Sequence, residues 1–320
     1  MRRLAEAIMR DAASTTDGLA DGIARYVALF KASPAARDVE TNRLIADLTA
    51  GRFSQGYAPQ IERHDSYIAL PGREIPVRIY SPGGAGPHPA LCYFHGGGFS
   101  MGSIASFDVV CAALAQASGA VVISGHYRRL PEADYASAQD DCDQVLAWTF
   151  RQAESLAIDP SSVAVAGDSA GALLALAAAA NTRDAGQAMP VCQLLFYGTF
   201  AMEPTRPTYA ASRDPLLTAE RIRSYIAVFR DAGGLDRHPA PVDRIDLAGL
   251  PPTHIVAAEF DPLRNEAEEL AARLGAAEVA TSFRCAPGMI HGFLRAIGVS
   301  PAARAELGHA ADAVRPFLRG

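Results

Sequence analysis

A serine stands at the centre of the motif Gly-Asp-Ser-Ala-Gly, which occupies residues 167–171. The apolar run 162–166 predicts a buried strand before the motif, and the Ala- and Leu-rich stretch 172–180 predicts a helix after it. Glycines on both sides of Ser169 allow a sharp strand-to-helix turn that exposes the serine hydroxyl. This setting indicates a nucleophilic serine; the alternative is an ordinary glycine-rich turn.

A second glycine-rich motif, His-Gly-Gly-Gly-Phe at residues 95–99, follows the apolar strand predicted over 90–94. Backbone N–H groups in such a loop can face a ligand with no side chain in the way. We expect the N–H groups of Gly97 and Gly98, together with that of Ala170, to form an oxyanion hole for a tetrahedral intermediate. His95 is expected to organise this loop and not to take part in chemistry.

A serine hydroxyl needs a base, and two C-terminal segments supply a base and an acid. One predicted strand, 253–258, runs into Glu-Phe-Asp-Pro-Leu, and another, 281–285, is followed by a loop that contains His291. The order serine, acid, histidine along the chain is that of α/β hydrolases. We expect Asp261 to orient His291, because Pro262 marks the loop there, whereas the rival acid Glu259 still lies on the strand pattern.

These motifs together resemble the hormone-sensitive-lipase-like branch of the α/β-hydrolase fold, the bacterial esterases with a His-Gly-Gly-Gly loop and a Gly-Asp-Ser-Ala-Gly elbow. The resemblance covers the chain from about residue 60 to its C-terminus. Segment 127–132 is similar to the family's Tyr-Arg-Leu-Ala-Pro-Glu segment, and segments 261–263 and 291–293 match its acid and base segments. The sequence departs from the family pattern at Arg129, Leu130, Ala172 and Asn265. None of these positions is a proposed catalytic group.

The resemblance implies a carboxylesterase that cleaves short-acyl, soluble esters through Ser169, His291 and Asp261 and an acyl-enzyme, with no cofactor and no metal. Two alternatives stay open. The same residues could cleave an amide or transfer an acyl group. The fold could also serve as a non-catalytic ligand receptor, as in the plant gibberellin receptors, although those have lost the histidine that His291 represents here.

The alternation of strand and helix patterns predicts one α/β domain over residues 56–320, with a mostly parallel, eight-stranded sheet flanked by helices. Strand patterns at 66–70 and 75–80 open the sheet. Six more patterns end at Phe94, Ser124, Ala166, Tyr197, Ala258 and Cys285, and helical patterns at 140–151 and 266–274 fall between strands.

Two segments lie outside this alternation, and the resemblance implies that they form a helical cap over the active site. They are the N-terminal residues 1–55 and an insertion at about 200–245, in which a helix from Thr218 carries apolar residues at helical spacing. Tyr225 and Phe229 on that helix are expected to contact substrate, as is Phe99 beside the glycine loop. Asp168 is expected either to contact substrate or to steady the elbow.

The composition excludes several classes of function. The chain has 320 residues, 49% hydrophobic and 20% charged, and a net charge of −6, which argues against nucleic-acid binding. The sole lysine is Lys31, so Schiff-base chemistry and a P-loop lack their essential residue. We expect free thiols at the five cysteines, no signal peptide or membrane span, and a cytoplasmic location. The sequence leaves open whether the chain forms a homodimer.

Overall fold

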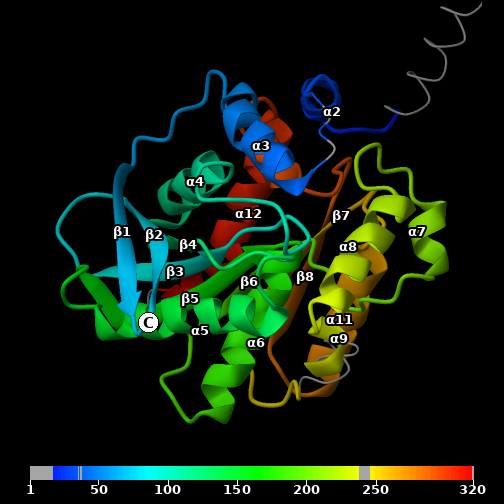
Figure 1. The fold of residues 1–320 in the computed structure, drawn as a ribbon. Helices are drawn as coiled ribbons and strands as arrows, with labels where there is room; N and C mark the ends of the chain where they lie inside the picture. The colour runs from blue at the N-terminus through cyan, green and yellow to red at the C-terminus, as the bar shows by residue number, and fades with distance from the viewer. Residues whose placement is uncertain (1–16, 35, 37, 238–245, 319–320) are drawn as a thin grey trace, which may run out of the picture.

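Eight strands form one sheet in the order β1-β2-β4-β3-β5-β6-β7-β8 (Figure 1) in the computed structural model, which describes residues 17–34, 36, 38–237 and 246–318. Strand β2 pairs antiparallel with β1 and with β4, and the pairs from β4 through β8 are all parallel. The strands are β1 (Glu62–Leu70), β2 (Arg73–Ser81), β3 (His88–Phe94), β4 (Val121–Gly125), β5 (Ile158–Asp168), β6 (Gln193–Phe196), β7 (Thr253–Ala258) and β8 (Thr281–Ala286).

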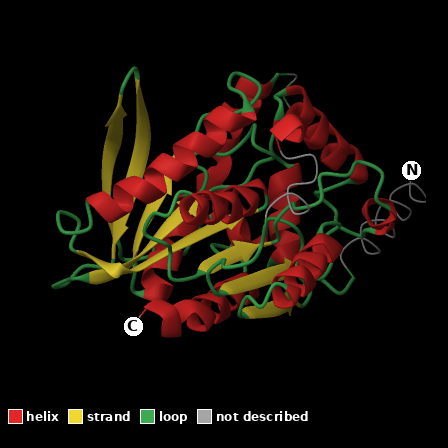
Figure 2. Ribbon diagram, turned by 90° about the horizontal axis from the view of Figure 1, so that it is seen from below, coloured by secondary structure: helices red, strands yellow, loops and turns green. Residues whose placement is uncertain are grey.

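Helices cover both faces of the sheet (Figure 2). One face carries α5 (Tyr135–Arg151), α6 (Ala170–Asp184) and α11 (Arg264–Ala276). The other carries α4 (Asp108–Ser118), the 3-10 turn η1 (Phe293–Ala296) and α12 (Pro301–Leu318). A parallel strand that is covered on both faces needs apolar side chains on both of them. In β5, Val163 and Val165 belong to the first core, and the alternating residues Ala164 and Ala166 belong to the second.

The predicted α/β-hydrolase architecture is confirmed, although several elements, β1 and α5 among them, begin earlier than predicted. Strand β1 begins at Glu62 instead of Ser66, because most of its residues are exposed and their polar side chains carry no apolar signal. Helix α5 begins at Tyr135, before the apolar stripe predicted over 140–151. Asp134 caps this helix by accepting a hydrogen bond from the N–H of Ser137 at 2.7 Å, so the extra turn is set by a cap and not by an apolar stripe.

The other helices of the described residues belong to the two segments expected to form a cap. They are α2 (Ile23–Lys31), α3 (Val39–Phe53), α7 (Pro207–Ala211), α8 (Ala219–Asp231) and α9 (Gly234–Arg237). Thus both segments expected to form a cap contain helices where the structure describes them. Residues 1–16 and 238–245 of these two segments lie outside the described part of the chain.

Candidate active site

Ser169 occupies the turn between β5 and α6, with φ 52° and ψ −119°. A non-glycine residue with positive φ costs of order 1–3 kcal/mol and persists only where its surroundings impose it. Here close backbone contacts do so: a Cβ atom built on Gly171 would lie 2.0 Å from the carbonyl oxygen of Phe94, and one on Gly167 would lie 2.2 Å from that of Gly171. The two glycines therefore let the turn pack tightly enough to expose the serine hydroxyl at the N-terminus of α6.

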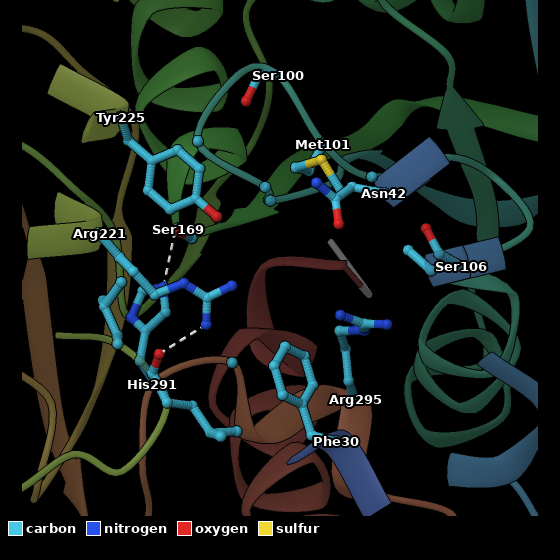
Figure 3. Close-up of a pocket in the computed structure, with 18 of the residues that line it drawn as sticks. Phe30, Asn42, Ser100, Met101, Ser106, Ser169, Arg221, Tyr225, His291 and Arg295 are labelled. Carbon is cyan, nitrogen blue, oxygen red and sulfur yellow. Dashed lines mark hydrogen bonds between the residues drawn. The ribbon is translucent and has the colours of Figure 1, made fainter. Parts of the chain in front are cut away.

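His291 lies between Ser169 and Asp261, although the three residues come from separate loops. The Ser169 hydroxyl is 2.8 Å from Nε2 of His291 (Figure 3). Nδ1 of His291 is 2.7 Å from Oδ2 of Asp261. The other Asp261 oxygen, Oδ1, accepts a hydrogen bond from the N–H of Leu263 at 2.8 Å, which orients the carboxylate. The arrangement forms a continuous path for a proton from the serine to the imidazole.

Glu259, the rival acid, has a different contact. Its Oε2 accepts a hydrogen bond from the N–H of Gly288 at 2.7 Å, so it ties the end of β7 to the loop that follows β8. The structure thus brings Asp261, and not Glu259, to the imidazole of His291. Glu259 instead supports the loop that carries His291.

The charge environment favours the protonated form of His291. Burial alone would lower the pKa of this imidazole, but the charge and hydrogen bond of Asp261 act in the opposite direction and are reinforced by the charges of Asp214 and Asp168. The net result is a His291 pKa above its usual 6.5. An imidazolium formed beside Ser169 would therefore be stabilised by the surrounding carboxylates.

Asp214 is a residue of this site that sequence reasoning missed. Its Oδ2 accepts a hydrogen bond from the backbone N–H of His291 at 2.7 Å, while Oδ1 accepts from the N–H groups of Leu216 and Leu217, both at 2.8 Å. Burial, followed by the charge of Asp261, raises its pKa to about 6. Asp214 thus links the segment before α8 to the histidine loop. No motif marks it, because all these partners are backbone groups.

The glycine loop presents free N–H groups beside Ser169. Within the described ranges, the N–H groups of Gly97, Gly98 and Ala170 have no acceptor in the protein. The preceding N–H, that of Gly96, donates to Oδ1 of Asp168 at 2.7 Å. The three residues expected to form an oxyanion hole thus have unused donors next to the serine.

Buried contacts of Asp168 and His95 fix the conformation of this loop. Oδ1 of Asp168 also accepts a hydrogen bond from the Tyr93 hydroxyl at 2.7 Å, and burial raises the pKa of Asp168 to about 6. His95 stacks on the ring of Tyr127 with centroids 4.5 Å apart, and burial lowers its pKa to about 3, so it is neutral. These contacts order the loop and do not point to proton transfer at His95.

A cavity of about 720 Å³ opens above Ser169 and His291. Its walls come from α2, α3, the glycine loop, α8 and the loop that carries His291, as the labelled side chains in Figure 3 illustrate. Tyr225 and Asp168, two of the residues predicted to contact substrate, line it. Elements far from Ser169 in the sequence, including α2, α3 and α8, thus form part of the cavity wall.

The structure places two of the residues expected to contact substrate elsewhere. Phe99 and Phe229 are buried and absent from the cavity wall; their ring centroids lie 5.0 Å apart, and both rings pack on Tyr135. They join α8 to α5 beneath the cavity. The apolar face of α8 is divided between this core and the cavity, so Tyr225 reaches the wall while Phe229 does not.

Two kinds of feature are absent from the residues that the structure describes. No group of three or more His, Cys, Asp or Glu side chains is placed to hold a metal ion there. No described helix is both long enough and apolar enough to cross a bilayer.

Comparisons with known proteins show the family to which the chain belongs. A family model described as the alpha/beta hydrolase fold matches residues 91–295. Carboxylesterase NlhH of Mycobacterium tuberculosis is 35% identical over 269 residues, 81% of this chain and 84% of the relative. An acetyl esterase of Salmonella typhi is 31% identical over 269 residues, 82% of each chain.

A solved structure shares the architecture as well. A hyperthermophilic esterase from the archaeon Pyrobaculum calidifontis superposes with a TM-score of 0.82 at 31% identity, over 89% of this chain and 95% of the other. The family match, the relatives and the shared architecture all extend across the segments that carry the site. The chain therefore belongs to the hormone-sensitive-lipase-like esterases of the α/β-hydrolase fold.

Proposed function

We propose that Ser169, His291 and Asp261 are the catalytic triad with which this carboxylesterase cleaves short-acyl esters. The observation that carries the proposal is the continuous hydrogen-bonded path from the serine hydroxyl through the imidazole to the carboxylate, at 2.8 and 2.7 Å. The named esterases that the chain resembles support the reaction class.

In the acylation step, Nε2 of His291 takes the proton of the Ser169 hydroxyl while Oγ attacks the ester carbonyl carbon. Asp261 accepts the hydrogen bond of Nδ1–H, which keeps Nε2 free and stabilises the imidazolium. The developing oxyanion accepts hydrogen bonds from the N–H groups of Gly97, Gly98 and Ala170. His291 then donates its proton to the leaving alcohol, and the acyl group stays on Ser169.

In the deacylation step, water takes the place of the alcohol. His291 removes a proton from the water, the hydroxyl oxygen attacks the acyl carbon, and the same donors stabilise the second oxyanion. Return of the proton to Ser169 releases the acid. An added alcohol that competes with water in this step measures any acyl transfer.

The triad assignment is tested by covalent labelling and by substitution. A phosphonofluoridate should add one phosphonyl group to Ser169, detected by mass spectrometry of its peptide. Ser169→Ala should abolish labelling and lower kcat for p-nitrophenyl acetate by roughly a million-fold. The control is Ser66→Ala, which removes an exposed serine on β1. This variant should keep both the labelling and the kcat of the wild type. Activity of Ser169→Ala within about tenfold of wild type would exclude the assignment.

Short acyl groups are proposed because bulky side chains limit the cavity. A volume of about 720 Å³ is in the usual range for small-ligand sites, and Tyr225 and Phe30 stand in its wall. We propose an acyl length of about two to six carbons, which a cavity of ordinary ligand size accommodates.

We further propose that the protein works in the cytoplasm without nucleic-acid partners, either alone or as a homodimer. The five cysteines all carry free thiols, which suits a reducing compartment, and the net charge of −6 repels phosphate backbones. Light scattering coupled to size-exclusion chromatography measures the oligomeric state.

A further inference from the structure

Arg295 is a cation in the wall of the active-site cavity. It lies on η1, shortly after His291 in the sequence, and lines the same cavity as Ser169. Its Nε is buried and has no hydrogen-bond partner. Within the described ranges, no carboxylate forms an ion pair with its guanidinium. A guanidinium carries five N–H donors in a planar fork that matches a carboxylate, so this group has unused binding capacity.

Aromatic rings hold the guanidinium of Arg295 in place. Its central carbon lies 5.3 Å from the ring centroid of Phe53 and 5.7 Å from that of Phe107. Cation–π contacts of this kind stabilise the charge and fix the plane of the group, but they leave its N–H donors unsatisfied. The side chain is therefore held at the cavity wall and is available to an acceptor inside the cavity.

The other charges at the cavity wall add to this positive character. Arg221 on α8 donates a hydrogen bond to the carbonyl oxygen of Leu216 at 2.8 Å and stacks over Phe30, again without a carboxylate partner in the described residues. Lys31 lines the same cavity. Figure 3 shows Arg221, from α8, and Arg295, from η1, on two sides of the cavity.

Among the described residues, two carboxylates line the wall, and both already accept hydrogen bonds. Asp38 caps α3 by accepting from the N–H and the hydroxyl of Thr41 at 2.7 and 2.9 Å. Asp168 accepts from the Tyr93 hydroxyl and the Gly96 N–H. In the described part of the wall, three cations thus stand against two carboxylates that already accept hydrogen bonds, and the cavity offers a site for an anion.

We propose that Arg295, assisted by Arg221, binds a carboxylate carried by the ester substrate. The preferred substrates are then esters with a free carboxylate, such as monoesters of short dicarboxylic acids, and not fully neutral esters. This inference rests on the proposed function, because it places the carboxylate in the cavity where Ser169 attacks. The carboxylate can be carried by the acyl part or by the alcohol part, and the test has one arm for each.

The first test uses wild-type enzyme and substrate pairs that differ in charge but hardly in shape. In the acyl arm, monoethyl succinate, glutarate and adipate are each compared with the ester in which an amide replaces the free carboxylate, and released ethanol is measured. In the alcohol arm, 3-acetoxybenzoate is compared with 3-acetoxybenzamide by release of acetate. We expect kcat/KM to be roughly tenfold to a hundredfold higher for the anionic member in one arm, the usual scale for a charge-assisted hydrogen bond.

The second test uses variants and the same ratio of anionic to neutral kcat/KM. Arg295→Gln should lower the ratio at least tenfold, mostly through KM, because it removes the charge and keeps a polar side chain. Arg295→Lys should keep part of the preference, because the charge stays while the planar fork is lost. Arg223→Gln is the matched control: Arg223 is an exposed arginine on α8 that does not line the cavity, and its loss should leave the ratio unchanged.

A binding measurement covers the case in which Arg295→Gln does not fold. Glutarate should inhibit wild-type hydrolysis of p-nitrophenyl acetate competitively and at least tenfold more strongly than glutaramide. Equal inhibition by the two compounds, a ratio near one in both substrate arms, or an equal loss of preference in Arg223→Gln and Arg295→Gln would each overturn the inference.

The outcomes also separate the inference from the proposed function. Hydrolysis of p-nitrophenyl acetate that depends on Ser169 but shows no preference for a carboxylate refutes the anion site and leaves the triad intact. Failure to cleave any ester, with no labelling of Ser169, refutes the proposed function, and the inference falls with it.

Discussion

The ring of Tyr225 lies directly over Gly98: a Cβ atom built on Gly98 would stand 2.2 Å from Cδ1 of Tyr225. Gly98 belongs to the glycine loop, and its φ of 58° is one that side-chain-bearing residues rarely adopt. Tyr225 belongs to α8, in the segment between β6 and β7. The contact therefore joins α8 to the glycine loop, and it leaves no room for a side chain at position 98.

Gly98→Ala is expected to damage catalysis more than folding. The added methyl group must displace either the loop or the ring of Tyr225, so an N–H donor moves away from the oxyanion position. We expect kcat for p-nitrophenyl acetate to fall by roughly a hundredfold to a thousandfold, the scale for loss of one such donor.

Gly119→Ala is the matched control for Gly98→Ala. Gly119 has a φ of 70°, and a Cβ atom built there would have no neighbour within 4 Å, so the change carries the backbone strain without the collision. It should lower the midpoint of thermal unfolding and leave kcat unchanged. Equal kcat values for Gly98→Ala and wild type would show that the Tyr225 contact does not position the loop.

The two acidic residues after β7 are expected to differ in their effect on turnover. Asp261→Asn should lower kcat on the order of ten-thousand-fold, because an amide at this place favours the tautomer of His291 with no free Nε2 lone pair. Glu259→Gln should cost far less turnover, since its partner is the N–H of Gly288, which an amide oxygen still satisfies. Steady-state kinetics of both variants provide the check, and the reverse ranking would reassign the acid to Glu259.

The acid limb of the pH profile is expected to report His291. The base acts in its neutral form, and the pKa of His291 is raised above 6.5, so kcat/KM should fall as the pH drops through a midpoint above 6.5. Asp214→Asn removes one of the charges that raise this pKa and should move the midpoint to lower pH. Its kcat should fall as well, because the amide nitrogen cannot accept from the N–H of His291.

The diagnostic quantity for Asp214 is the midpoint, measured from kcat/KM on both sides of the His291 pKa. Asp231→Asn, which removes an exposed carboxylate at the end of α8, should leave the midpoint in place. An unchanged midpoint in Asp214→Asn would show that Asp214 acts on His291 through the backbone contact alone.

Tyr225 is expected to limit the acyl length. Across p-nitrophenyl esters from acetate to palmitate, kcat/KM of the wild type should be highest at about two to six carbons, because the cavity has ordinary small-ligand size. Tyr225→Ala should move the maximum to longer chains, whereas Tyr67→Ala, a change of an exposed tyrosine on β1, should not. A wild-type maximum at about ten carbons or beyond would rule out this role of the cap.

The features that could be predicted from the sequence are those encoded by neighbouring residues. The turn at Ser169 depends on two glycines within a few positions, and a strand or helix shows its apolar face as a period of two or 3.6 residues. The eight-stranded α/β-hydrolase architecture follows from such local signals. Asp261 and His291 could also be named, because each closely follows a strand and parallel strands end at one edge of the sheet.

Only the tertiary structure decided which side chains share a surface. Periodicity shows that α8 has an apolar face, but it cannot show that Phe229 enters the core while Tyr225 reaches the cavity, because that depends on what packs against each. The chain order likewise does not show that Arg295 forms no ion pair with a carboxylate of the described residues, nor that Asp214 contacts the histidine loop. Both arise from contacts, or their absence, between segments far apart in sequence, and no local pattern records which charges will be neutralised when those segments pack together.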